Sequence, residues 1–249
     1  MRLFVHEVRG QLLLYTRSKE LAFFTFLLPL ILFILLGSTY GNDTINGDRG
    51  ADFLEAGMLG YGLVSTAFAG LAIVMVVRRE MGILKRVRAT PLPAWAYLSA
   101  VVASTLIAFA VNSICMIAIG RGLFSVPLPD RWLSLVLTLV LGAFAFAALG
   151  LAMTVIVRSA EGASASVNAV YLPMSFISGS FFSPHSFPQF LRAIAAVLPL
   201  TYFIHLTRDV MLHGHQFWDN WGDVGVIAAW GAVGAIVAIW RFRWEPAER

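Results

Sequence analysis

The sequence predicts an all-α integral membrane protein with six transmembrane helices, formed by residues 1–249 as a single domain. Of the 249 residues, 59% are hydrophobic and 13% are charged, whereas soluble domains carry about 25% charged residues. The mean hydropathy is +0.78. Long apolar runs alternate with short basic clusters, which is the pattern of a multi-pass membrane protein.

Each predicted span is a run of mainly apolar residues close to the ~20 that a helix needs to cross the bilayer. The first run contains no charged residue, and Arg241 and Arg243 close the last one. The predicted spans are residues 21–39, 56–77, 92–119, 132–157, 163–182 and 224–240.

The distribution of lysine and arginine predicts the orientation of the chain in the membrane. Of the 18 basic residues, 13 fall in the terminal segments and the second and fourth connections, and 5 fall in the other connections. Because basic residues accumulate on the cytoplasmic side, we expect both termini to be cytoplasmic in a multi-pass protein of the cell membrane.

Residues 1–20 predict an amphipathic helix that does not span the membrane. One apolar stripe is formed by Phe4, Val8, Leu12 and Tyr15, and basic residues occupy the rest of the surface. A helix of this kind lies in the headgroup layer. A cationic leader that only sets the topology is the alternative.

The connection between the second and third spans, residues 78–91, combines apolar and basic positions. Ile83, Leu84 and Val87 fall at helical spacing, while the basic side chains of residues 85, 86 and 88 point elsewhere. Thr90-Pro91 ends the turn. The pattern predicts a short helix parallel to the membrane, acting either as a topology anchor or as a docking helix for another protein.

Residues 183–213, between the fifth and sixth predicted spans, are largely apolar but interrupted by Pro184, Pro188 and Pro199. The pieces 189–198 and 201–212 are too short to cross the membrane. Such segments favour a pair of re-entrant or interfacial helices. Their polar faces carry Arg192, His205, Arg208 and Asp209.

Several classes of chemistry find no support in the sequence. The chain has only two lysines, Lys19 and Lys85, and no G-x-x-x-x-G-K-[ST] phosphate-binding loop, so we expect it to bind no nucleotide itself. His205, His213 and His215 favour interfacial histidines over a metal site, because no carboxylate cluster completes a ligand set. We therefore expect no catalytic residue, no metal and no bound cofactor.

The net charge of +4 and the pI near 9.6 do not indicate nucleic-acid binding, because the basic residues flank apolar runs. The polar groups inside the spans are mostly neutral, and include Asn112 and Asn168. Hydrogen bonds between helices are their expected role, with a place on a transport pathway as the alternative. Small residues recur on the fourth and last spans, at Ala143, Ala147, Gly150, Thr154, Gly231 and Ala235, and predict close helix packing.

Two segments resemble motifs of a known family. The stretch RREMGILKRVRATPLPAWAYL at residues 78–98 is similar to a loop of the form E-x-G-x-x-[KR]-R-x-R-[AV]-T-P, and residues 179–212 are similar to a proline-rich sGxffP...lP...lPlty...R stretch. With the N-terminal amphipathic segment, they resemble the membrane subunit of ATP-binding-cassette exporters of the ABC-2 type. The SPHSFP portion is only a loose match.

The resemblance implies a dimer of six-span subunits, a homodimer in the simplest case, with two separate ATPase subunits on the cytoplasmic face that hold ATP and Mg²⁺. It also implies that residues 1–20 are an elbow helix and residues 78–91 a coupling helix, and that residues 183–213 gate the outer mouth. Carried over, the ATPase contact comprises Glu80, Gly82, Ile83, Leu84, Lys85, Arg86, Arg88, Thr90 and Pro91, and the gate comprises Gly179, Pro184, Pro188, Pro199 and Arg208.

The resemblance implies export, and the apolar spans, which lack a charged central groove, favour a small hydrophobic drug or antibiotic as the substrate. A lipid or a lipid-linked glycan is the alternative substrate class. An ATP-independent channel or secondary carrier is the alternative from a different functional class.

Overall fold

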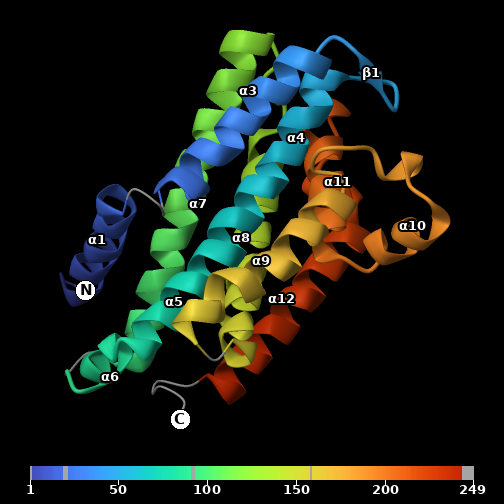
Figure 1. Ribbon diagram of the computed structural model, residues 1–249. Helices are drawn as coiled ribbons and strands as arrows, with labels where there is room; N and C mark the ends of the chain where they lie inside the picture. Colours follow the sequence, from blue (N-terminus) through green and yellow to red (C-terminus); the bar gives the residue numbers. More distant parts are fainter. Residues whose placement is uncertain (1, 19–21, 91–92, 158, 243–249) are drawn as a thin grey trace.

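The computed structural model describes residues 2–18, 22–90, 93–157 and 159–242, and these form one bundle of helices (Figure 1). One end of the bundle carries the short helix α6 and the end of α12; the opposite end carries a small β-hairpin. The elements are α1 (Arg2–Arg17), η1 (Phe23–Leu27), α3 (Leu28–Tyr40), β1 (Thr44–Ile45), β2 (Asp48–Arg49), α4 (Gly50–Leu63), η2 (Val64–Gly70), α5 (Leu71–Glu80), α6 (Ile83–Arg88), α7 (Ala94–Phe124), α8 (Trp132–Ile156), α9 (Ala160–Ile177), η3 (Pro184–Ser186), α10 (Gln189–Ala195), α11 (Pro199–Leu212), η4 (Phe217–Asp219) and α12 (Trp221–Arg241).

Within the described residues, five helices are long and apolar enough to cross a membrane, and six if the bent pair α10–α11 counts as one span. The five are Phe23–Tyr40, Gly50–Glu80, Trp95–Phe124, Trp132–Ile156 and Trp221–Arg241. They confirm five predicted spans, with the second and third extended beyond the predicted ends. Residues 21 and 92, where two predicted spans begin, lie outside the described part.

The predicted fifth span, residues 163–182, differs from the structure. Helix α9 ends at Ile177, because Gly179 adopts a positive φ of 93° that turns the chain. The helix is 18 residues long and packs beside α5, but Glu161 and Asn168 make it too polar to count among the five apolar spans.

The segment Gly50–Glu80 is the central helix of the bundle, and 83% of its most apolar window is buried. Elements α3, α7, α8, α9 and α11 all pack around it. In its middle, the turn η2 is a π-helix, a rare geometry often found at functional sites. The helix is therefore surrounded by protein on nearly every side.

Small residues make this central position possible. A Cβ atom at Gly57 would lie 2.3 Å from the carbonyl oxygen of Ser180, and one at Gly60 would lie 2.5 Å from Ile204. On the fourth span, a Cβ atom at Gly150 would lie 2.7 Å from the carbonyl oxygen of Ala67. Of the predicted small residues, Gly150 and Gly231 are thus confirmed at close helix contacts.

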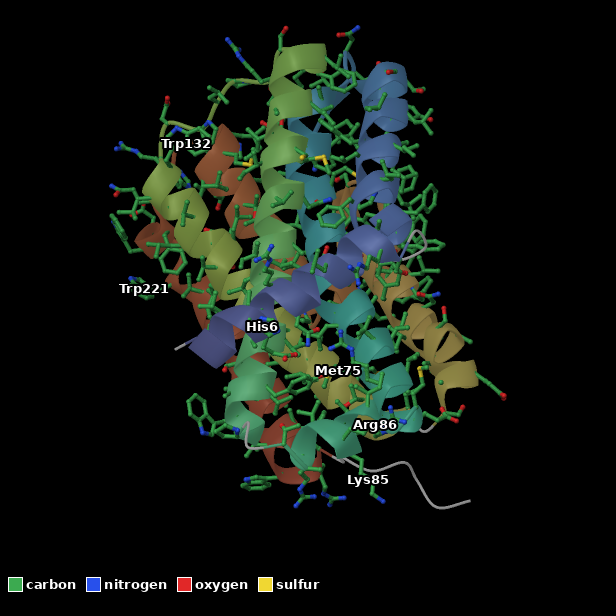
Figure 2. All side chains as sticks on the ribbon, turned by 90° about the vertical axis from the view of Figure 1, so that its left-hand side faces the viewer. His6, Met75, Lys85, Arg86, Trp132 and Trp221 are labelled. Carbon is green, nitrogen blue, oxygen red and sulfur yellow. The ribbon has the colours of Figure 1, made fainter. Side chains whose placement is uncertain are left out.

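Helix α1 confirms a helix in the predicted N-terminal segment, over Arg2–Arg17. It packs against α7 and lies across the bundle at an angle to the long helices (Figure 2). Phe4, Val8 and Leu12 of the predicted stripe are half-buried, and the side chain of Tyr15 lies outside the described residues.

The proline-rich segment folds as predicted into two short helices. Helices α10 and α11 meet at an angle of 83°. Pro188 precedes α10 and Pro199 is the first residue of α11, a position that needs no intrahelical N–H donor. The sequence did not predict the two-residue strands β1 and β2, where Asn46 and Gly47 form the turn with positive φ angles.

Exposed tryptophans lie at the ends of the three long helices α7, α8 and α12. Trp132 and Trp221 begin α8 and α12 (Figure 2), and Trp95 and Trp240 lie at the α6 end. Tryptophan collects where a bilayer meets water, so this arrangement fits a bundle that crosses a membrane.

We expect Gly57→Ala to lower the apparent midpoint of thermal unfolding in detergent. The added Cβ would meet the Ser180 carbonyl at 2.3 Å, and overpacking of this kind costs about 1–3 kcal/mol. Gly225→Ala is the matched control, because nothing lies within 4 Å of its ideal Cβ. Its midpoint should stay equal or rise, since alanine favours a helix. Equal midpoints for the two variants would contradict the close approach.

Candidate functional site

The α6 end of the central helix is held by two buried arginines. Arg79 donates from Nη1 to the carbonyl oxygen of Thr154 at 2.7 Å and from Nη2 to that of Val157 at 2.6 Å. Arg78 donates to the hydroxyl of Tyr97 on α7 at 3.0 Å. Both arginines are less than 10% exposed. Their contacts fasten the end of α5 to α7 and α8.

The next residue, Glu80, fastens α5 to a third helix. Its carboxylate accepts a hydrogen bond from the backbone N–H of Ala160, the first residue of α9. A helix leaves its first N–H groups and its last carbonyl groups without intrahelical partners. Arg79 therefore satisfies the end of α8, and Glu80 satisfies the start of α9.

The charges also match the dipoles of the two helices. A cation is favourable at a helix C-terminus and an anion at an N-terminus, and Arg79 and Glu80 occupy those places. Helix α8 ends at Ile156 and α9 begins at Ala160, so neighbouring residues of α5 can reach both ends. We call Arg78, Arg79 and Glu80, with the groups that they bind, the α5 junction.

Helix α6 follows the junction after one tight turn. Gly82, with a φ of 70°, ends the central helix and redirects the chain. Leu84 is fully buried in a cluster with Met75, Tyr97 and Val101. One apolar side chain thus anchors α6 to the bundle.

The other face of α6 is turned away from the bundle. Lys85, Arg86 and Arg88 are exposed, and Figure 2 shows Lys85 and Arg86 pointing outward at this end of the molecule. Met81 and Ile83 are exposed beside them, at 66% and 36%. The short helix therefore presents cations mixed with apolar side chains.

The structure places the predicted contact residues in two groups. Glu80 and Leu84 are engaged within the chain, whereas Ile83 and the three basic residues of α6 face outward. Thr90 lies after α6 and its hydroxyl donates to the carbonyl oxygen of Val87 at 2.6 Å. Pro91 lies outside the described residues.

At the other side of the molecule, three of the five predicted gate residues, Gly179, Pro184 and Arg208, form one contact set. Arg208 of α11 donates to the carbonyl oxygen of Gly179 at 2.6 Å and stacks its guanidinium 3.5 Å above the ring of Phe53. Pro184 packs against Gly179. Arg208 therefore ties α11 to the turn after α9 and to the central helix. Pro188 and Pro199 lie at the starts of α10 and α11, where they bound the bent pair.

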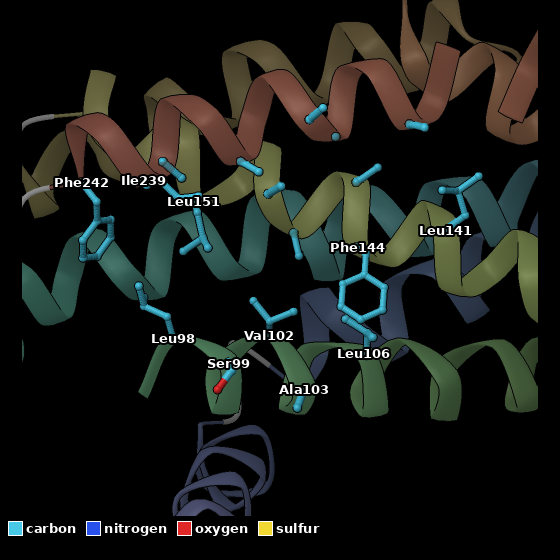
Figure 3. A pocket seen from close by; sticks show the side chains of 18 residues that line it. Leu98, Ser99, Val102, Ala103, Leu106, Leu141, Phe144, Leu151, Ile239 and Phe242 are labelled. Carbon is cyan, nitrogen blue, oxygen red and sulfur yellow. The ribbon is translucent and has the colours of Figure 1, made fainter. Parts of the chain in front are cut away.

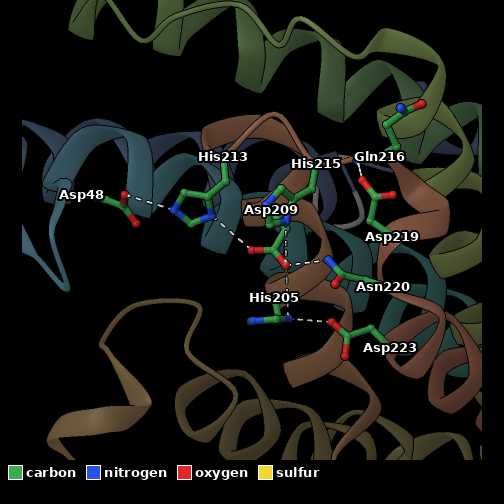
Figure 4. A network of polar contacts seen from close by, with 9 residues as sticks. All are labelled: Asp48, His205, Asp209, His213, His215, Gln216, Asp219, Asn220 and Asp223. Carbon is green, nitrogen blue, oxygen red and sulfur yellow. Dashed lines mark hydrogen bonds and ion pairs between the residues drawn. The ribbon is translucent and has the colours of Figure 1, made fainter.

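The histidines lie beside this set, around Asp209 (Figure 4). Asn220 donates to Asp209 Oδ2 at 2.6 Å, and His213 Nδ1 lies 3.1 Å from Asp209 Oδ1. His205 Nδ1 lies 2.6 Å from Asp223 Oδ2 at the start of α12. His213 also approaches Asp48 of the hairpin at 3.5 Å. The cluster joins α11, α12 and the hairpin, and within the described residues no group of these side chains could hold a metal ion.

The two asparagines occupy different environments. Asn112 is fully buried and donates to the carbonyl oxygen of Thr25 at 3.2 Å, which links α7 to η1. Asn168 lies on the partly exposed face of α9, where it donates to Ser164 at 3.3 Å. The contact of Asn112 is a hydrogen bond between helices, whereas Asn168 lies at the protein surface.

Sequence reasoning treated Arg78 and Arg79 only as topology signals and missed their contacts. A usable signal was present in the sequence. Two adjacent arginines and a glutamate end a helix that is otherwise apolar, and only a short link separates the next two predicted helices. Charges at that place are the partners that exposed helix ends need.

A comparison with protein families identifies the family of this chain. The model of the family described as ABC-2 type transporter matches residues 2–212. The chain belongs to the ABC-2 type transporter family. The match includes the α5 junction, α6 and the whole bent pair α10–α11.

The curated proteins that are similar to this chain include inner membrane transport permeases. The inner membrane transport permease YhhJ of Escherichia coli K12 is 25% identical over 170 residues, which are 68% of this chain and 46% of YhhJ. The inner membrane transport permease YadH of the same strain is 24% identical over 217 residues, 86% of this chain and 80% of YadH. Nodulation protein J of Rhizobium leguminosarum bv. trifolii is 32% identical over 124 residues, 48% of this chain and 47% of that protein. The chain thus spans about half the length of YhhJ.

We expect Arg79→Met to destabilise this ABC-2 family member by about 3–5 kcal/mol. The change leaves the buried carbonyl oxygens of Thr154 and Val157 without their charged donor and breaks a buried polar contact. Arg88→Met is the matched control at an exposed position, where changes stay within about 0.5 kcal/mol. Unfolding in mixed detergent micelles, followed by circular dichroism, measures both. A loss in Arg79→Met no larger than the control would refute the role of the junction.

Proposed function

We propose that this chain is the transmembrane subunit of an ATP-driven exporter in the inner membrane, with both termini in the cytoplasm. Two copies would form the pathway, and two separate ATPase subunits would dock at the α6 end. Hydrolysis of ATP with Mg²⁺ on those ATPase subunits supplies the free energy. The chain itself supplies the docking surface, the pathway and the gate.

One observation carries the proposal: α6 exposes Lys85, Arg86 and Arg88 at one end of a membrane bundle while Leu84 is buried at its base. Cations flanked by exposed Met81 and Ile83 make a surface with a polar and an apolar component. Charged patches select complementary partners and set the docking register. An acidic groove on an ATPase subunit is the surface that fits.

The α5 junction supports a role in transmission. Two residues, Met81 and Gly82, connect α5 to α6. A force on α6 would therefore act directly on the end of α5, where Arg78, Arg79 and Glu80 make their buried contacts. Those contacts belong to α7, α8 and α9. We infer that a shift of α6 moves these helix ends together as a rigid body, the type of motion by which packed bundles change state.

The exposed face of α9 supports a pathway between two copies. Ser164 and the partly exposed Asn168 lie together on that face of a helix in the membrane bundle, and Ser166 is exposed on another side of the same helix. Hydroxyl and amide groups are unfavourable against lipid and favourable against protein or a hydrated cavity. We therefore assign this face to the second copy and to the pathway, and infer that Asn168 contacts substrate while Asn112 supports packing.

At the opposite end, the contact of Arg208 with Gly179 and Phe53 supports a gate formed by residues 183–213. The 83° bend between α10 and α11 supports a re-entrant hairpin for this segment. The exposed apolar residues of α9, Val170, Leu172 and Phe176, favour a hydrophobic or amphiphilic substrate of the drug or antibiotic class.

We expect the double variant Arg86→Glu/Arg88→Glu to abolish co-purification of the ATPase subunit with this chain. Reversing two exposed charges replaces attraction by repulsion at the proposed docking surface. The measurement is a pull-down from membranes that contain both subunits, with ATP hydrolysis of the recovered complex as a second readout.

Arg121→Glu/Arg131→Glu is the control for that experiment, because both arginines are exposed at the far end of the bundle. It should retain the ATPase subunit at the level of the unmodified chain. Full retention of the ATPase subunit by the α6 variant would remove α6 from the docking surface and, with it, the proposed transmission route.

A further inference from the structure

A long apolar groove runs along the bundle on the side formed by α7, α8 and α12 (Figure 3). Its volume is about 790 Å³. Leu98 and Leu106 of α7 form one wall, α8 forms the floor, and Ile239 of α12 with Phe242 directly after it forms the other wall. Ser99 is the only polar side chain among the described residues that line it.

The groove exists because small residues recess its surface. Gly231 of α12 packs against Ala145 of α8, with its ideal Cβ position 3.0 Å from the Ala145 backbone. Alanines such as Ala148 and Ala232 continue the recess on either side of this contact. Helix α12 therefore lies close on α8, while the longer side chains of α7 and the end of α12 stand up as walls.

The shape of the groove selects a narrow occupant. On α12 the lining runs from Ala228 to Phe242, about 21 Å along the helix axis at 1.5 Å per residue. A transmembrane helix about 10 Å wide and 30 Å long has a volume of roughly 2,400 Å³, about three times that of the groove. An extended hydrocarbon chain fits within the space, whereas a further helix would leave most of its volume outside the groove.

The α6 end of the groove has the chemistry of a lipid headgroup site. Trp95 lies one turn before Leu98, and Trp240 lies between two lining residues; they are 72% and 81% exposed. Arg241 is exposed directly before Phe242. Tryptophan settles at the headgroup level, and an exposed arginine at that level attracts an anionic lipid.

We propose that this groove binds one acyl chain of an anionic glycerophospholipid, with the phosphate of the lipid at Arg241. The apolar groove offers water almost no hydrogen-bond partners, and it faces away from the buried central helix. The occupant is a resident lipid that fills the space between α7 and α12. The inference is independent of what the protein transports and of the ATPase partner.

Native mass spectrometry of the purified chain tests the proposal, with phosphatidylglycerol or phosphatidylcholine added to the detergent solution. The unmodified chain should retain one phosphatidylglycerol more tightly than further copies of that lipid. Ala232→Phe puts a ring into the groove and should weaken this first binding event about tenfold or more. Ala103→Phe, on the opposite wall, should have the same effect and serves if Ala232→Phe does not fold.

Ala229→Phe is the matched control, since Ala229 is exposed on the same helix but does not line the groove. It should retain the first lipid as the unmodified chain does. Arg241→Gln should lower the preference for phosphatidylglycerol over phosphatidylcholine by about fivefold, the effect of one basic residue near a lipid surface. Equal lipid retention by Ala232→Phe, Ala103→Phe and Ala229→Phe would mean a non-specific lipid annulus and would overturn the proposal.

Discussion

The structure depends on how the polar ends of helices are satisfied inside an apolar bundle. Helix α8 ends and α9 begins within a few residues of each other, next to the end of the central helix. Away from water, the free carbonyl and N–H groups at these ends require partners. Arg79 and Glu80, neighbours in the sequence, supply a cation for one end and an anion for the other. Arg79 and Glu80 therefore have a structural role, since they stabilise the ends of two helices.

The contacts of these charged residues also attach the end of α5 to its neighbouring helices. The residues that bind Arg78, Arg79 and Glu80 come from α7, α8 and α9, so the end of α5 is held on three sides. Gly82 and the buried Leu84 then place α6 as a short lever with its basic face outward. In the mechanism that we propose, a displacement of α6 would be passed on to the attached helix ends, because protein interiors are close-packed. The family membership of the chain fits this arrangement.

Much of this fold is readable from the sequence, since runs of apolar residues and the placement of prolines depend on local chemistry. Five spans, the N-terminal helix and the two helices after Pro188 and Pro199 are predicted near their observed positions. The end of α9 is not, because it depends on the positive φ of Gly179 and on the distant Arg208. The α5 junction and the outward face of α9 also escape prediction. In the junction, Arg79 and Glu80 contact residues 75 to 80 positions away, such as Thr154 and Ala160; the sequence indicates charges at this helix end but not which groups they bind.

The central claim is that α6 and the start of α9 move as one body. Spin labels at Lys85→Cys and Glu161→Cys, both exposed positions, test it in a variant whose single cysteine, Cys115, is replaced. The distance between the labels is measured by pulsed electron paramagnetic resonance in the proposed complex with the ATPase subunits, without nucleotide and with ATP bound. The account predicts the same distance distribution in both states. A clear change in that distance on ATP binding would contradict it.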